Sequence, residues 1–134
     1  MNATVLDQSV LNVFRAIDSM DAPAFAKAFA EDGTFRFGNS EPAVGRAQVE
    51  QSASGFFSMI RGLSHEITGV WSGSWEGGEV KSVEAEVTYT REDGTRTQPL
   101  PVTSTIRMAG DRIKDYRIFM DVSPLFAHSE ARST

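Results

Sequence analysis

Four long segments rich in β-branched and aromatic residues occupy the second half of the chain, and they constrain the fold more than any other feature. They are Ser64–Trp75, Val80–Arg91, Thr97–Met108 and Arg112–Val122. The connections between them contain Gly77-Gly78, Asp93-Gly94 and Gly110-Asp111. Such residue pairs adopt the positive φ angles that tight hairpin turns require. Because connections this short join only antiparallel neighbours, the pattern predicts an antiparallel meander of four long strands.

The first half of the chain has helical spacing instead. Val10, Phe14 and Ile17 recur at intervals of four and three, which is typical of an amphipathic helix. Asp21 followed by Ala22-Pro23 indicates the N-cap and first turn of a second helix. The sequence thus predicts helices over Val5–Met20, from Asp21 to the stop at Asp32-Gly33 and over Arg46–Arg61, with a short strand at Thr34–Phe37.

Helices followed by hairpin-linked strands indicate an α+β fold, with three N-terminal helices packed on one side of a strongly curved, mostly antiparallel sheet. A length of 134 residues favours one domain, with an ordered core over about residues 5–126. Alternation predicts an apolar inner face formed by Val83, Ala85, Val87 and Tyr89; Val102, Ser104, Ile106 and Met108; and Tyr116, Ile118, Met120 and Val122.

Composition excludes several classes of function. The chain has no cysteine and two histidines, so thiolate metal sites, thiol nucleophiles and three-histidine centres are excluded. Its net charge of −5 disfavours nucleic-acid and anionic-membrane surfaces. There is no glycine-rich phosphate loop, so we expect neither a nucleotide nor another cofactor or metal. The first residues lack the basic and apolar regions of a signal peptide, which favours a cytoplasmic location.

Several short motifs resemble the SnoaL-like branch of the NTF2-like superfamily over roughly residues 5–126. They are Phe29-Ala30-Glu31-Asp32-Gly33-Thr34-Phe35, Gly45-Arg46, Val87-Thr88-Tyr89-Thr90 with Asp93-Gly94, and Tyr116-Arg117-Ile118-Phe119-Met120-Asp121. The resemblance implies a cone-shaped α+β fold with a deep pocket, usually dimeric. The superfamily includes polyketide cyclases, ketosteroid isomerases, limonene epoxide hydrolases, dehydratases and noncatalytic binding modules, so the fold alone does not determine the function.

Two of these activities are disfavoured by the residues at the matching positions. The catalytic positions of the ketosteroid isomerases fall on Val13, Phe37 and Ser104, which lack the acid and base that this mechanism needs. The limonene epoxide hydrolases resemble the chain around Pro42–Arg46, yet the two positions that hold their water on the first strand are phenylalanines. Of their site only Asp121 remains.

The SnoaL-type cyclases use an aspartate near the end of the last strand as general acid/base, and Asp121 matches that position. In an apolar cone its pKa would be raised, which suits proton transfer near neutral pH. The alternative is that Asp121 caps the following turn, because strict alternation directs it away from the inner face. Tyr116, Tyr89 or His65 would polarise a carbonyl, although a partly buried structural histidine is the commoner outcome at His65.

The resulting hypothesis is a small-molecule enzyme of SnoaL-like type that performs proton transfer, as a cyclase, isomerase or dehydratase, on a hydrophobic carbonyl compound. Asp121, Tyr116 and His65 are the candidate catalytic residues. The alternative is a noncatalytic ligand-binding or dimerisation module. We also expect a homodimer through the convex face of the sheet. The candidate ligand-binding residues are Phe14, Phe35, Phe37, Phe57, Trp71, Tyr89, Ile106, Ile118 and Met120.

Overall fold

The structure is a computed structural model that describes residues 8–127 of the chain. Its elements are α1 (Gln8–Asp18), α2 (Ala22–Lys27), β1 (Phe29–Phe37), β2 (Ala43–Val44), α3 (Arg46–Phe57), β3 (Gly62–Trp75), β4 (Gly78–Thr90), β5 (Leu100–Ala109) and β6 (Arg112–Phe119). A short helical turn follows at residues 123–127. Within the described residues no helix is long and apolar enough to cross a membrane.

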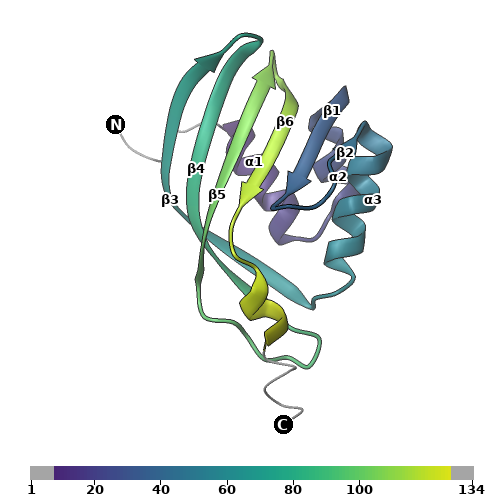
Figure 1. The fold of residues 1–134 in the computed structure, drawn as a ribbon, viewed down its shortest axis with the longest axis vertical. Coiled ribbons are helices and arrows are strands. Elements are labelled where there is room, and N and C mark those ends of the chain that lie inside the picture. Colours follow the sequence, from purple (N-terminus) through teal and green to yellow (C-terminus); the bar gives the residue numbers. More distant parts are fainter. Residues whose placement is uncertain (1–7, 128–134) are drawn as a thin grey trace.

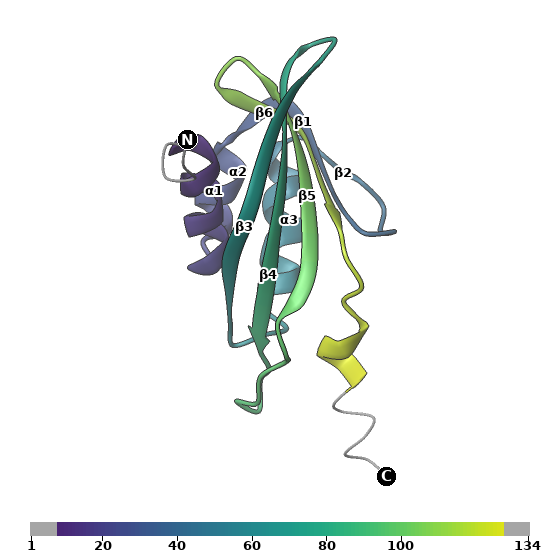
Figure 2. The same cartoon turned by 90° about the vertical axis from the view of Figure 1, so that its left-hand side faces the viewer.

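All six strands belong to one sheet, in the order β2-β1-β6-β5-β4-β3. Strands β3 to β6 form the predicted antiparallel meander, whereas β1 runs parallel to β6. The sheet curves around α1, α2 and α3, which lie on its concave side (Figures 1 and 2). The α+β fold class is therefore confirmed. The side of the sheet away from the helices is called the outer face below.

The prediction for the second helix was correct at its start and wrong at its end. The Asp21 carboxylate accepts a hydrogen bond from the main-chain N–H of Ala24, as an N-cap does, but α2 ends at Lys27. Phe29 is already part of β1, fully buried and paired with Ile113 of β6. Gly33 permits the close approach of the two strands, because a Cβ there would lie 2.8 Å from the Ile113 carbonyl oxygen. Long-range strand pairing therefore overrides the helical spacing.

The other predicted boundaries shift by a few residues. Helix α3 ends at Phe57 rather than Arg61, and β6 ends at Phe119 rather than Val122. Strand β5 begins at Leu100 rather than Thr97. Of the helix predicted over Val5–Met20, residues 5–7 lie outside the described residues and α1 ends at Asp18.

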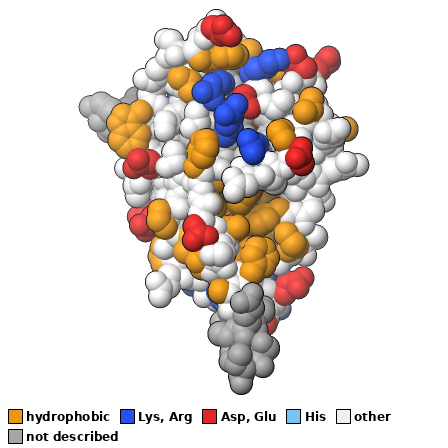
Figure 3. Space-filling view, viewed as in Figure 1, with side chains coloured by type: hydrophobic (Ala, Val, Ile, Leu, Met, Phe, Trp, Pro, Cys, Tyr) orange, Lys and Arg blue, Asp and Glu red, His pale blue; other side chains and the backbone are white. Residues whose placement is uncertain are grey.

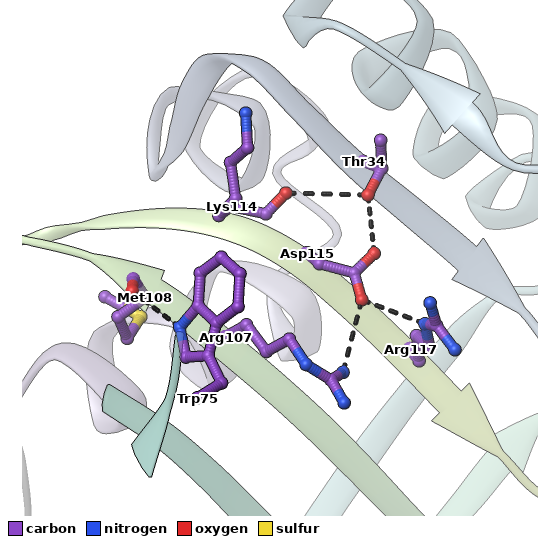
Figure 4. A network of polar contacts seen from close by, with 7 residues as sticks. All are labelled: Thr34, Trp75, Arg107, Met108, Lys114, Asp115 and Arg117. Atoms are coloured by element: carbon purple, nitrogen blue, oxygen red, sulfur yellow. Dashed lines mark hydrogen bonds and ion pairs between the residues drawn. The ribbon is translucent and has the colours of Figure 1, made fainter. Parts of the chain in front are cut away.

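Strand β1 is fastened to the sheet by a polar network on the outer face (Figure 4). The Asp115 carboxylate accepts hydrogen bonds from the Thr34 hydroxyl of β1 and from the Arg117 guanidinium, the latter at 2.9 Å. Arg107 of β5 forms an ion pair with the same carboxylate at 3.4 Å. One carboxylate thus links three adjacent strands and fixes the register of the parallel pair.

The predicted alternation holds for β4, β5 and most of β6 but fails in β3. A bulge between Ile67 and Gly69 reverses the side to which later residues point. Trp71, predicted to face inward with Ile67, therefore lies on the outer face with 56 % of its surface exposed. Its indole lies across Gly69, where a Cβ would be 2.5 Å from the ring. A single inserted residue accounts for this error.

Phe25 of α2 is the centre of the hydrophobic core. Its ring meets those of Phe29, Phe35 and Tyr116 edge to face, with centroid distances of 5.1, 5.1 and 5.5 Å. All four side chains are buried. Such contacts add stability beyond the burial of area, so this cluster holds the helices against β1 and β6.

Phe25→Ala should lower the free energy of unfolding by about 3–5 kcal/mol, because it removes a fully packed ring and leaves a cavity. Urea unfolding followed by circular dichroism measures the loss. Val44→Ala is the control, since Val44 is more than half exposed and its truncation should change stability by less than about 0.5 kcal/mol. Equal losses in the two variants would contradict this description of the core.

Candidate active site

A cavity of about 400 Å³ lies between the concave face of the sheet and α3. Figure 3 shows it as a hollow lined by hydrophobic side chains, below a group of Lys and Arg side chains on the same face of the molecule. Helix α3 contributes polar and aromatic residues, and the segment after β6 contributes Met120, Val122 and Phe126. This size is within the range of small-molecule sites.

Aromatic rings form much of the cavity wall. Phe37 of β1 and Tyr89 of β4 both pack against Phe56 of α3, with ring centroids 5.1 and 5.6 Å apart. Phe56 is not among the candidate residues, although it is an apolar residue of the predicted third helix. The candidates that line the cavity are Phe35, Phe37, Phe57, Tyr89, Ile118 and Met120, together with His65 and Tyr116.

Three candidate ligand-binding residues lie elsewhere. Trp71 is on the outer face because of the bulge in β3. Phe14 is buried and packs edge to face against the His65 ring, with centroids 5.0 Å apart, so it supports the cavity from behind. Ile106 faces a second cavity of about 280 Å³ between α1, α2 and β5.

Asp18 and His65 form the most specific polar contact at the cavity. The His65 Nδ1 atom lies 2.6 Å from Asp18 Oδ1, and the His65 main-chain N–H donates to Asp18 Oδ2 at 3.0 Å. The imidazole is 9 % exposed and the Asp18 side chain 30 % exposed. Both carboxylate oxygens are therefore engaged by one residue, which fixes the position and the plane of the ring.

This geometry determines which ring nitrogen is free. A carboxylate accepts hydrogen bonds, so Nδ1 must carry the proton that it shares with Asp18, and Nε2 of the neutral ring has a lone pair. Nε2 has no hydrogen-bond partner among the described residues. Every fully buried side-chain nitrogen or oxygen among the described residues has a hydrogen-bond partner. Since Nε2 has none, it is not fully buried, and His65 lines the cavity. An unprotonated nitrogen held in this way can accept a proton from a bound molecule.

Buried hydroxyl groups line the same cavity. They belong to Ser104 of β5, Tyr116 of β6 and Tyr89 of β4. Burial raises the pKa of the Tyr116 phenol far above its usual value, the Ser104 side chain lowers it partly through a hydrogen bond, and the charge of Asp18 raises it. The Tyr89 phenol is also buried, which raises its pKa, and it donates to the Met120 sulfur at 3.6 Å. Both phenols therefore stay protonated near neutral pH and can act only as hydrogen-bond donors or acceptors.

Asp121 is not in the cavity, and the expectation of a buried acid there is wrong. Its side chain is exposed and accepts a hydrogen bond from the main-chain N–H of Ser123 at 3.0 Å. Hydrogen bonds from the Ser123 hydroxyl and main chain lower the pKa of Asp121 rather than raise it. Strand β6 ends two residues earlier, so no bulge redirects the carboxylate inward. Asp121 caps the turn, as the alternative interpretation had it.

Sequence reasoning missed Asp18 because it ends a predicted amphipathic helix, where a polar residue attracts no attention. One signal was available. A carboxylate in the last turn of a helix is unfavourable, because the unpaired carbonyls there carry partial negative charge. Asp18 is the last residue of α1, and such a placement suggests that a specific partner compensates for it. Only the structure identifies the partner as His65, which is 47 positions away.

The charged and metal-ligating side chains around the cavity are few. No lysine or arginine is among the residues that the structure places on its wall. Within residues 8–127, no three side chains of His, Cys, Asp or Glu come close enough together to hold a metal ion. The chemistry that this wall offers is thus that of an imidazole, an amide (Gln51) and several hydroxyl groups in an apolar setting, and Ser104, Tyr89 and Tyr116 are the buried hydroxyl-bearing residues among them.

Comparisons with known proteins agree with this architecture. No curated protein matches the chain. A protein of ketosteroid isomerase-like fold from Catenulispora acidiphila, solved in complex with trimethylamine, is 20 % identical with a TM-score of 0.76, and the match covers 92 % of each chain. ActVI-ORFA from Streptomyces coelicolor is 17 % identical with a TM-score of 0.67, over 85 % of this chain and 92 % of that one.

A third similar structure is SalBIII, described as an epoxide hydrolase/cyclase-like enzyme in pyran ring formation of the polyether salinomycin. It is 16 % identical with a TM-score of 0.69, over 87 % of this chain and 91 % of that one. These likenesses show a common NTF2-like fold. The sequence of residues 10–116 matches the SnoaL-like domain family, and this range includes both Asp18 and His65. Since the match extends over most of the chain, the protein belongs to the SnoaL-like domain family.

Proposed function

We propose that the protein is a small-molecule enzyme that moves protons by general acid/base catalysis on a hydrophobic carbonyl compound, as SnoaL-like cyclases, isomerases or dehydratases do. The observation that carries the proposal is the 2.6 Å contact between Asp18 and His65 on the wall of an apolar cavity. His65 is the proposed base, in place of Asp121.

The first step is removal of a proton from the carbon next to the carbonyl. The C–H bond breaks, its proton passes to His65 Nε2, and its electron pair moves toward the carbonyl oxygen to give an enolate. Asp18 stabilises the imidazolium that forms, since its carboxylate already accepts the Nδ1 proton. The Tyr116 and Ser104 hydroxyls are the proposed donors to the enolate oxygen.

The fate of the enolate distinguishes the three reaction classes. Return of the proton to another carbon is an isomerisation, loss of a β-hydroxyl group as water is a dehydration, and attack on a second carbonyl closes a ring. All three need one base with a fixed tautomer and a dry cavity, where electrostatic interactions are stronger than in water. The ring-forming role given for SalBIII, whose fold is similar, supports a reaction of this kind.

Hydrogen–deuterium exchange at the α-carbon of 2-tetralone, a bicyclic aromatic ketone, tests this chemistry without a known substrate. In D₂O the wild-type protein should accelerate exchange, followed by ¹H NMR. His65→Gln should lower the catalysed rate by about 10²–10⁴-fold, because it removes the proton acceptor. Asp18→Asn should also lower it, because an amide can turn its N–H toward Nδ1 and so favour the opposite tautomer.

Asp121→Asn is the matched control, since it changes an exposed carboxylate outside the cavity and should leave the exchange rate unchanged. Full exchange activity in His65→Gln would refute the proposed base. If wild-type protein bound 2-tetralone without accelerating exchange, the noncatalytic ligand-binding module would be the better description.

A homodimer through the outer face is part of the proposal. On that face Arg107 and Arg117 lie on β5 and β6, whereas the exposed carboxylates of Glu66, Glu84 and Glu86 lie on β3 and β4. In a twofold arrangement the basic half of one protomer would face the acidic half of its partner.

The charge-reversed variant with Glu84→Lys and Glu86→Lys should be monomeric under conditions where the wild type is dimeric. Light scattering coupled to size-exclusion chromatography measures both masses. A second sample at 1 M salt, where the Debye length is about 3 Å, should shift the wild type toward monomer. A monomeric wild type at low salt would contradict this interface.

A further inference from the structure

The last described segment forms part of the cavity wall. Residues 123–127 make a helical turn beside the loop that joins β4 and β5 (Figure 1). Val122 and Phe126 from this segment line the cavity. The sequence predicts a strand as far as Val122 and gives residues 123–127 no role in a site.

Arg91, the residue after the end of β4, holds this turn in place. Its Nε atom donates to the Leu125 carbonyl at 3.0 Å, and one terminal nitrogen donates to the Pro124 carbonyl at 2.9 Å. The other terminal nitrogen donates to the Thr95 hydroxyl at 3.2 Å, so the guanidinium is itself fixed. The Leu125 side chain is buried in a hydrophobic cluster that also contains Ile60, Val87 and Val102. The turn is therefore anchored from two sides, which holds the main chain of the residue after Leu125 beside the cavity.

Phe126 combines exposure with a place on the wall. It is 45 % exposed and yet lines the cavity, and Met59, just after α3, is 48 % exposed and does the same. Each of these apolar side chains touches both solvent and the cavity, which identifies the pair as its mouth. His65, with a side chain only 9 % exposed, lies at the deep end.

We infer that Phe126 is a specificity-determining residue that sets how long a molecule fits between His65 and the mouth, and that Arg91 is its positioning residue. This inference rests on the proposed function for the orientation of the ligand, with its carbonyl toward His65 and an uncharged apolar tail toward Phe126. The ligand class is an elongated aromatic ketone, because Phe35, Phe37 and Phe56 line the same cavity as His65 and Phe126.

A series of 4-alkylacetophenones, with alkyl chains from methyl to octyl, measures this length by isothermal titration calorimetry. Each methylene group that is buried against the apolar cavity wall should lower Kd by about fourfold. The improvement should stop at the chain length that reaches Phe126. In Phe126→Ala the limit should move to chains longer by two or more carbons, and in Phe126→Trp it should move to shorter chains.

Trp71→Ala is the matched control, because Trp71 is also an exposed aromatic residue but lies on the outer face, away from the cavity. Its length limit should equal that of the wild type. The inference is overturned if Phe126→Ala leaves the limit unchanged or shortens it, if Trp71→Ala shifts it as much, or if the wild type binds no member of the series.

Arg91 is tested through the same readout. Arg91→Ala should move the length limit to longer alkyl chains, as Phe126→Ala does. Arg91→Lys should restore the wild-type limit in part, because an ammonium can donate to the carbonyl of Pro124 or Leu125. An unchanged limit in a folded Arg91→Ala protein overturns the positioning role. Should that variant fail to fold, the two Phe126 variants still decide the proposal.

The exchange experiment and the binding series can contradict the proposed function and the role of Phe126 independently of each other. A wild type that shows no α-carbon exchange but keeps a Phe126-dependent limit would overturn the proposed function alone. A limit that ignores Phe126, with exchange intact, would overturn only the present inference.

Discussion

The carboxylate of Asp18 joins the end of α1 to β3 by accepting hydrogen bonds from the main chain and the ring of the same histidine. The arrangement of the site depends on this contact. It places a helix terminus against the sheet, sets the plane of the imidazole and assigns the proton to Nδ1. Phe14 supports the ring from the helix side. A structural link and a proposed catalytic group are therefore the same pair of residues.

The curved sheet supplies the environment in which this pair can act. Alternation places apolar and aromatic side chains on the concave face and charged ones on the outer face, so the cavity wall is mostly apolar while the outer surface is polar. The Phe25 cluster and the Asp115 network keep β1 in register with β6, which positions Phe35 and Phe37 on that wall. Segments that are distant in sequence thus form the wall of the cavity that His65 lines.

Much of the fold could be predicted from local patterns, because strand alternation and turn pairs are local signals. The inward placement of Tyr89 and Tyr116 follows from alternation alone. Trp71 could not be placed, because a bulge has no reliable sequence signature and reverses every later residue. The partnership of Asp18 with His65 is a long-range contact that depends on how α1 docks. Asp121 was misplaced because a family position was transferred to a strand that ends before it.

The tautomer of His65 shows whether Asp18 holds the ring as the geometry indicates. Long-range ¹H–¹⁵N correlation spectra of the imidazole, recorded above the pH at which the ring is charged, distinguish a proton on Nδ1 from one on Nε2. The contact with Asp18 predicts the Nδ1–H form in the wild type and its loss in Asp18→Asn. A wild-type ring protonated on Nε2, or a tautomer that is indifferent to Asp18, would contradict it.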